Sequence, residues 1–202
     1  MRSSDPGQDN NGWKTQSRIT RYVDDHLEVV VEKVKSPSHP KAKTWTTVRR
    51  KPAVVIAPMT RDGNFLLIQQ ERIPIRAALW EMPAGQIDGA AEPSREEIEA
   101  TALRELREET GHTLAGERKL ISLGEFYSSP GFTDERCFFF LARPVEPIAQ
   151  PEEAETESIL DCRAFTAAEL RRMIVENEIR DANTLSICAR LVAAGFLGLA
   201  PS

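Results

Sequence analysis

The chain has 202 residues, of which 41% are hydrophobic and 28% charged, with 11 glycines, 13 prolines and a net charge of −5. This length suits one domain with appendages, and the composition excludes collagen-like, low-complexity and disordered classes. The negative charge gives no general attraction for nucleic acid or an anionic membrane surface. No apolar run reaches the roughly 18 residues that a membrane span needs. We therefore expect a globular protein with neither a nucleic-acid nor a membrane partner.

The three cysteines, Cys137, Cys162 and Cys188, are widely spaced and form no CxxC pair. With three histidines in the chain, this disfavours a thiol-rich zinc site, and an odd number of cysteines disfavours a disulfide framework even more. Free thiols predict a cytoplasmic protein. The polar residues 1–16 predict a flexible N-terminal tail without a targeting signal.

The strand and helix signals follow one another in an irregular order. Ordered structure is expected from near Arg18. A strand region is predicted over residues 17–50 and a second region over residues 51–202. The predicted strands are 27–34, 44–49, 53–57, 65–69, 120–127, 136–142 and 159–165. One helix is predicted over 95–110, with Ser94 and Glu97 as a capping box and Gly111 as its end. Two more are predicted after a second capping box at Thr166 and over 181–194. The pattern indicates the α/β class, with a sheet covered by helices.

The helix predicted over 95–110 carries an unusual group of carboxylates. Its expected core stripe consists of Ile98, Ala102, Leu103 and Leu106. Glu105, Glu108 and Glu109 stand at i, i+3 and i+4, so they share one face, with Glu105 and Glu109 at the edge of the apolar stripe. Like charges at this spacing repel. Two interpretations remain open: a solvated acidic face balanced by Arg104 and Arg107, or an oxygen-only site for Mg²⁺ or Mn²⁺.

The segment Arg104–Gly111 resembles the second half of the Nudix box, G-x5-E-x7-R-E-U-x-E-E-x-G-U, where U is bulky and aliphatic. Glu96 precedes Arg104 at the spacing that the pattern asks for. Two positions depart from it: Ala90 stands where the first glycine belongs, and His112 stands at the last aliphatic position. Gly85 is the expected counterpart of the missing glycine, which makes the loop before the helix longer than the pattern.

Within the Nudix family, the chain is most similar to the ADP-ribose pyrophosphatase branch. The similar segments are 67–72 with 80–85, the proline-containing loop 128–135, the acidic Glu155-Thr156-Glu157 and the helix junction 179–184. The resemblance implies a mixed β-sheet sandwiched between helices (α/β/α) over 51–202. It also implies an antiparallel N-terminal strand region over 17–50 that pairs two chains in a homodimer.

The resemblance further implies Mg²⁺-dependent hydrolysis of ADP-ribose, a small-molecule nucleotide, to AMP and ribose 5-phosphate. Mn²⁺ can substitute, and more than one ion is expected. The implied metal ligands are the Ala84 carbonyl and the carboxylates of Glu105, Glu109 and Glu157. Glu108 is implied as a further ligand or a base relay, and Arg104 as a residue that orients a glutamate.

The remaining implied roles concern the base and the substrate. Glu155 is the implied general base, and the alternative is that it belongs to a solvated acidic linker. Arg72 is implied to contact the diphosphate, and Glu81 and Glu135 to accept hydrogen bonds from ribose hydroxyls. Two alternative functions stay open: hydrolysis of a GDP- or UDP-sugar, and a non-catalytic Nudix module that only binds a nucleotide.

Overall fold

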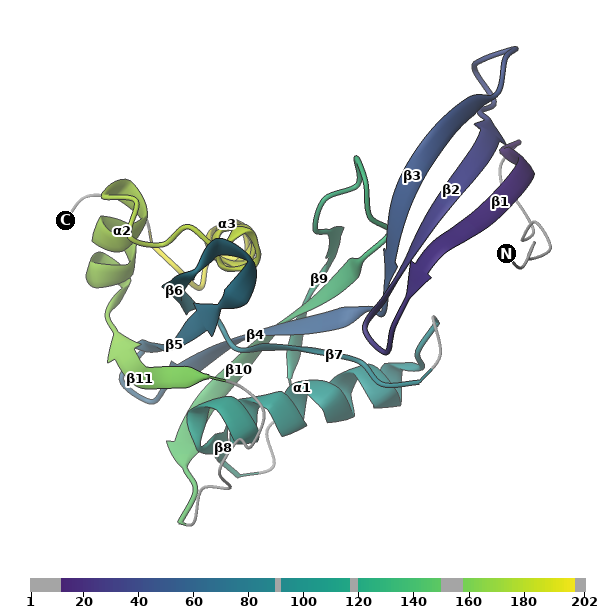
Figure 1. Ribbon diagram of the computed structural model, residues 1–202. Coiled ribbons are helices and arrows are strands. Elements are labelled where there is room, and N and C mark those ends of the chain that lie inside the picture. Colours follow the sequence, from purple (N-terminus) through teal and green to yellow (C-terminus); the bar gives the residue numbers. More distant parts are fainter. Residues whose placement is uncertain (1–11, 90–91, 117–119, 150–157, 199–202) are drawn as a thin grey trace. The chain divides into compact units, whose positions relative to one another are not determined.

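The computed structural model describes residues 12–89, 92–116, 120–149 and 158–198 (Figure 1). These residues form two compact units. One contains residues 12–51 and 127–136, and the other contains residues 52–126 and 137–198 within the described ranges. Each unit contains its own β-sheet.

The first unit is built on a three-stranded antiparallel sheet of β1 (Lys14–Val23), β2 (Leu27–Lys35) and β3 (Lys43–Arg50), in that order. Asp24 closes the first turn, because its Oδ1 accepts hydrogen bonds from the N–H groups of His26 and Leu27, both at 2.8 Å. The prediction of a tail through residue 16 is wrong for residues 14–16, since β1 begins at Lys14, which pairs with Lys35. Residues 1–11 of the predicted tail lie outside the described residues.

The segment 127–136 joins this sheet although it is far away in the sequence. The Val48 N–H donates to the Phe132 carbonyl at 2.8 Å, and the Trp45 indole N–H donates to the Gly131 carbonyl at 3.0 Å. These bonds attach the predicted proline-containing loop to β3. Such a long-range pairing leaves no local signal in the sequence.

The second unit contains an eight-stranded sheet. Its strands are β4 (Ala53–Thr60), β5 (Phe65–Arg72), β6 (Ala77–Glu81), β7 (Ala84–Gln86), β8 (His112–Leu114), β9 (Ile121–Tyr127), β10 (Arg136–Pro147) and β11 (Ile159–Phe165). The order is β11-β5-β4-β10-β8, while β6, β7 and β9 pair with β5, β4 and β10. Because β4 and β10 run parallel and β5 is antiparallel to β4, the sheet is mixed, as predicted.

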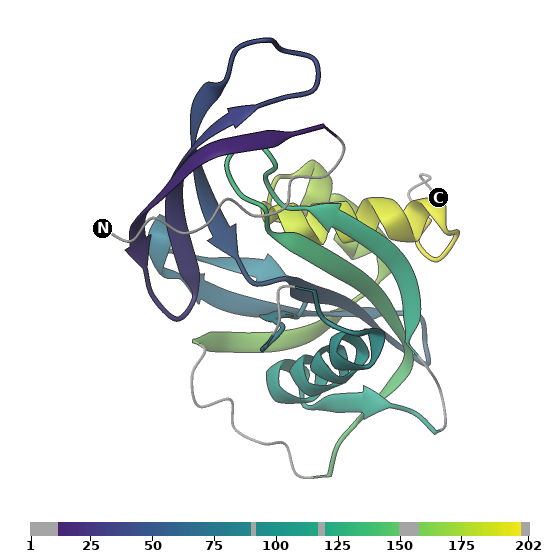
Figure 2. The ribbon, with the colours of Figure 1, turned by 90° about the vertical axis from the view of Figure 1, so that its right-hand side faces the viewer.

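Helices cover both faces of this sheet: α1 (Arg95–Thr110) on one, and α2 (Ala167–Val175) with α3 (Ala182–Ala193) on the other (Figure 1 and Figure 2). The alternation of side chains along a strand explains the layers. In β4, Val55 and Ala57 belong to the core cluster that includes α2 and α3, whereas Val54 and Ile56 belong to the cluster that includes α1. The predicted α/β/α architecture is confirmed.

The helix boundaries follow local signals. Ser94 and Glu97 form the predicted capping box at the start of α1, and Gly111 ends the helix in a left-handed conformation with φ 67°. Thr166 caps α2 in the same way. None of the helices in the described ranges combines the length and apolar character needed to cross a lipid bilayer.

Candidate active site

Helix α1 turns two carboxylates toward the sheet. Glu105 and Glu109 are only 7% and 5% exposed, and they lie among the buried residues of the helix. With 100° per residue, both stand about 20° from Ile98 around the helix axis, whereas Leu103 stands about 140° away. The prediction that Leu103 belongs to the core stripe is therefore wrong, since it is 36% exposed. The two glutamates therefore lie on the buried face, on either side of Ile98 and beside the apolar stripe, as predicted.

Arg104 holds two of the three carboxylates with its two terminal nitrogens. Its Nη2 donates to Glu105 Oε1 at 2.6 Å, and its Nη1 donates to Glu108 Oε2 at 2.7 Å. Partial burial works against the charge on the guanidinium, but the negative charges of Glu105, Glu108 and Asp88 outweigh it, so the pKa of Arg104 lies above its ordinary value. The guanidinium therefore stays charged and fixes the orientation of both carboxylates.

The start of strand β7 lies directly against these glutamates. The Ala84 N–H donates to Glu109 Oε2 at 2.8 Å. A Cβ atom at Gly85 would lie 2.0 Å from Glu105 Oε1 and 2.1 Å from its Cδ. Glu105 thus fills the space that any other residue at position 85 would need. This places Gly85 where the resemblance expects the missing glycine of the box to act.

The donor set of this site fits a hard divalent cation. Glu105, Glu108 and Glu109 offer only oxygen atoms, on adjacent turns of one helix, beside the backbone of Ala84. Among the described residues, no three His, Cys, Asp or Glu side chains already converge on one point. The three carboxylates do not converge because each bonds to another group. Glu105 and Glu108 accept hydrogen bonds from Arg104, and Glu109 accepts one from the Ala84 N–H.

Arg72 and Glu81 form a tight pair on neighbouring strands β5 and β6. The Arg72 Nε donates to Glu81 Oε1 at 3.0 Å, and Nη2 donates to Oε2 at 2.6 Å. The Glu81 side chain is 4% exposed, whereas that of Arg72 is 40% exposed. Arg72 also lines a pocket of about 360 Å³ together with Glu71, Ile73, Arg76, Ala77 and Ala78. The guanidinium of Arg72 is therefore partly exposed to solvent, and the buried Glu81 carboxylate fixes its position.

Glu135 belongs to the other unit. It is 8% exposed, forms an ion pair with Arg50 at 2.9 Å and accepts a hydrogen bond from Ser128 Oγ at 2.6 Å. The predicted base Glu155 and the predicted ligand Glu157 lie outside the described residues. The chain is described again from Ser158, whose carbonyl accepts a hydrogen bond from the Glu71 N–H at 3.0 Å.

Two residues near the carboxylates were missed from the sequence. Asp88 lies in the longer loop before α1, and its charge acts on Arg104. Cys162 on β11 has its Sγ 4.0 Å from the Thr110 carbonyl, and burial, with the charges of Asp161 and Glu109, raises the pKa of its thiol to about 11. A single acidic residue in a loop and a single cysteine in a strand carry no local signal of such a position.

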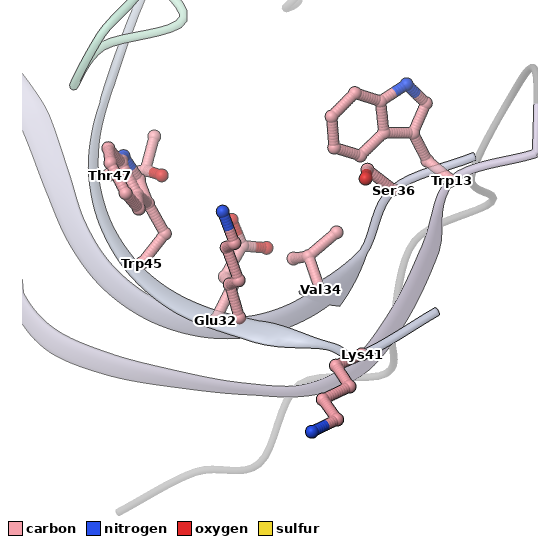
Figure 3. A pocket seen from close by; sticks show the side chains of 8 residues that line it. Trp13, Glu32, Val34, Ser36, Lys41, Trp45 and Thr47 are labelled. Atoms are coloured by element: carbon pink, nitrogen blue, oxygen red, sulfur yellow. The ribbon is translucent and has the colours of Figure 1, made fainter. Parts of the chain in front are cut away.

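The first unit contains a hollow of about 370 Å³ on its sheet (Figure 3). Trp13 and Trp45 are half exposed there, and Glu32 and Val34 lie between them along the curved strands. The other residues that line it are Ser36, Lys41, Lys43 and Thr47. The sequence alone gave no indication of this hollow.

A mixed sheet between helices, with a box of glutamates on the helix that follows β7, defines a class of hydrolases. The model of the NUDIX domain matches residues 49–185, so the chain belongs to the Nudix hydrolase family. Members of this family in general depend on divalent metal ions. The predicted family and enzyme class are confirmed.

Individual relatives show which members of the family the chain is similar to. The chain is 32% identical to the ADP-ribose pyrophosphatase of Bacillus subtilis (strain 168) over 78% of its length and 80% of the relative. It is 34% identical to the ADP-ribose pyrophosphatase of Mycobacterium tuberculosis (strain ATCC 25618 / H37Rv) over 71% of its length and 67% of the relative. The crystal structure of an ADP compounds hydrolase, 17% identical, superposes with a TM-score of 0.72 over 95% of this chain and 100% of the other. The last comparison shows the shared fold.

Proposed function

We propose that this Nudix hydrolase cleaves the diphosphate linkage of ADP-ribose with the help of a divalent metal ion, giving AMP and ribose 5-phosphate. The observation that carries the proposal is the buried pair Glu105 and Glu109, which lies against Ala84 and Gly85 of β7. The choice of ADP-ribose follows the two relatives that are named ADP-ribose pyrophosphatase.

Hydrolysis of a diphosphate demands charge neutralisation and positioning more than covalent chemistry from the protein. We assign the metal to Glu105, Glu109 and the Ala84 carbonyl, with Glu157 as a further ligand. Bound there, a metal ion supplies the positive charge that offsets charge on the phosphate oxygens. Hard oxygen ligands favour Mg²⁺, with Mn²⁺ as a substitute, and the number of carboxylates allows more than one ion.

The remaining residues of the proposed site have two tasks, which are to orient the carboxylates and to transfer protons. Arg104 holds Glu105 and Glu108 in fixed directions, which keeps Glu108 available as a ligand or a proton relay. Glu155 takes the proton of the attacking water while the water oxygen bonds to phosphorus and the bridging P–O bond breaks. Glu155→Gln should lower kcat far more than metal affinity, and wild-type kcat in this variant would place the base elsewhere.

Arg72 and Glu81 form the proposed substrate contact on the sheet. The outward guanidinium of Arg72 suits bidentate contact with diphosphate oxygens, and Glu81 keeps it in place. We assign to Glu81 and Glu135 the contacts with ribose hydroxyls. For Glu81, the hydrogen bonds from Arg72 add the second role of holding the phosphate-binding side chain.

A homodimer and a cytoplasmic location belong to the same proposal. Trp13, Tyr22 and Trp45 of the first unit are each at least half exposed, and aromatic side chains of this kind are enriched in subunit interfaces. Cys137, Cys162 and Cys188 are free thiols, which suits a reducing compartment. The mass measured by light scattering after gel filtration tests the dimer, and a mass of one chain at micromolar concentration would contradict it.

A substrate panel tests the proposed activity directly. The purified protein with Mg²⁺ is given ADP-ribose, NADH, GDP-mannose, UDP-glucose and diadenosine polyphosphates, and the products are separated by chromatography. We expect ADP-ribose to give the highest kcat/KM, with AMP and ribose 5-phosphate as products, and a chelator to abolish turnover until Mg²⁺ or Mn²⁺ is restored. Preference for a GDP- or UDP-sugar would overturn the substrate, and binding without turnover would indicate a non-catalytic module.

A further inference from the structure

Thr184, at the start of α3, contacts the backbone of the turn that leads to the box glutamates. The Met82 N–H donates to Thr184 Oγ1 at 2.8 Å, although more than one hundred residues separate the two in sequence. Thr184 is completely buried, so water cannot replace this bond if the hydroxyl is removed. A buried threonine that bonds a distant backbone amide has a more specific task than filling the core.

Asp181 fixes the direction of the Thr184 hydroxyl. As the N-cap of α3, Asp181 accepts with Oδ2 both the Thr184 N–H at 2.7 Å and the Thr184 hydroxyl at 2.8 Å. Since the hydroxyl hydrogen points at the carboxylate, the oxygen of Thr184 is left to accept a hydrogen bond. The Met82 N–H supplies that bond. A continuous series of hydrogen bonds therefore connects the N-cap of α3 to the turn after β6, from Asp181 through Thr184 to Met82.

The turn after β6 is held from three separate elements of the second unit. Thr184 of α3 holds the Met82 N–H, the Ile56 N–H of β4 donates to the Pro83 carbonyl at 2.8 Å, and Glu109 of α1 accepts the Ala84 N–H. Met82 stands directly after Glu81, which pairs with Arg72, and two residues before Ala84. A shift at Met82 therefore reaches both the substrate-binding side and the glutamate side of the turn.

We propose that Thr184, with its hydroxyl fixed by Asp181, is a positioning residue that sets the position of the turn between β6 and β7, and with it Glu81 and Ala84, against α1. The inference rests on the proposed function, because the turn matters for turnover only if Ala84 and Arg72 act in hydrolysis. Loss of the hydroxyl leaves the fold intact and misplaces the Ala84 backbone and the Glu81–Arg72 pair.

The test compares Thr184→Val, which keeps the shape and removes the hydroxyl, with Thr184→Ser, which keeps the hydroxyl. Ile187→Val, on the next turn of α3 and equally buried, is the matched control that trims the core without touching a hydrogen bond. Each variant is measured for the melting temperature, for kcat and KM with ADP-ribose and Mg²⁺, and for amide hydrogen exchange of the peptide that covers residues 79–86.

We expect Thr184→Val to lower kcat at least tenfold and to speed exchange in this peptide at least tenfold. Thr184→Ser should restore both, and Ile187→Val should leave both near wild type at a comparable melting temperature. Equal kcat and exchange in Thr184→Val and wild type would overturn the proposal, as would the same losses in Ile187→Val. If Thr184→Val does not fold, Asp181→Ala replaces it, since it frees the hydroxyl without removing it, and wild-type exchange and kcat in that variant would again overturn the proposal.

The exchange measurement separates this proposal from the proposed function. If the wild-type protein does not hydrolyse ADP-ribose, the proposed function fails, yet the peptide still reports whether Thr184 holds the turn. If the wild-type protein is active and exchange in the turn does not depend on the hydroxyl, the positioning role fails alone.

Discussion

At the scale of single residues, the site depends on close contacts that leave no spare space. Gly85 allows the Glu105 side chain to lie against the backbone of β7, and Arg104 divides its two terminal nitrogens between Glu105 and Glu108. Burial of both Glu105 and Glu109 keeps two like charges near each other, which costs free energy unless positive charge accompanies them. Arg104 supplies part of that charge, and the proposed metal ion supplies the rest.

Gly85→Ala tests the contact with Glu105. The new Cβ would meet the carboxylate at 2.0 Å, so Glu105 or the backbone of β7 must move. Overpacking of this kind typically costs about 1–3 kcal/mol, and we expect in addition at least a tenfold loss of kcat because Glu105 is displaced. Thermal unfolding and steady-state kinetics measure the two effects.

The control for this variant is Gly198→Ala, where an added Cβ meets no atom within 4 Å. It should match wild type in both measurements. Wild-type kcat in Gly85→Ala would mean that turnover does not require Glu105 to be held in one position against β7.

At the scale of elements, α1 is specified by its ends and by the spacing of its buried side chains. The capping box, the left-handed Gly111 and the pattern of Ile98, Ala102 and Leu106 all agree on one helix, and these signals could be used from the sequence alone. The strands β6, β7 and β8 could not be predicted in this way, because three to five residues are too few to show a period. Their pairing comes from tertiary contacts.

Ser94→Ala tests the role of the cap. Removing an N-cap hydroxyl costs about 1 kcal/mol of unfolding free energy, which lowers the melting temperature of a protein of this size by about 2–4 °C. Because Glu105 and Glu109 lie in the last two turns of α1, we expect kcat to stay within twofold of wild type.

Thr166→Ala removes the equivalent cap of α2 and should give a similar loss of melting temperature. Calorimetry of both variants beside wild type provides the comparison. A large loss of kcat in Ser94→Ala but not in Thr166→Ala would show that the start of α1 affects the active site in addition to stabilising the helix.

In the molecule as a whole, the separation of contacting residues along the chain explains which predictions were possible. The short apolar run at 53–57, the strand signals that follow it and the helical spacing of apolar residues near the end of the chain predict the layered second unit, and the box predicts its glutamates. The attachment of loop 127–136 to β3 and the hydrogen bond from Met82 to Thr184 join residues that are distant in sequence. Nothing local in the sequence encodes these contacts, so they required the structure.

Stability at alkaline pH is a property of the whole fold that the buried thiols should affect. Burial raises the pKa of Cys188 to about 12, while a cysteine in an unfolded chain titrates near 8.5. Between these values the unfolded state binds fewer protons than the folded state, so the free energy of unfolding falls as pH rises. The melting temperature of wild type should therefore fall more steeply between pH 8 and 10 than that of Cys188→Ala.

Ile187→Val, which loses packing on the same helix without an ionisable group, should keep the wild-type slope with pH. Calorimetric scans at both pH values decide the matter. Parallel slopes in wild type and Cys188→Ala would contradict a raised pKa for this thiol.

Glu109→Gln shows whether the buried carboxylates of α1 carry the hydrolysis. A glutamine keeps the shape and an oxygen that can accept the Ala84 N–H, but it removes the charge. We predict that ADP-ribose turnover with Mg²⁺ falls on the order of 10²–10³-fold while the melting temperature stays near wild type, and that Glu99→Gln, the same change on an exposed ion pair of α1, has no such effect. Undiminished turnover in Glu109→Gln would mean that the hydrolysis does not need the negative charge of this carboxylate.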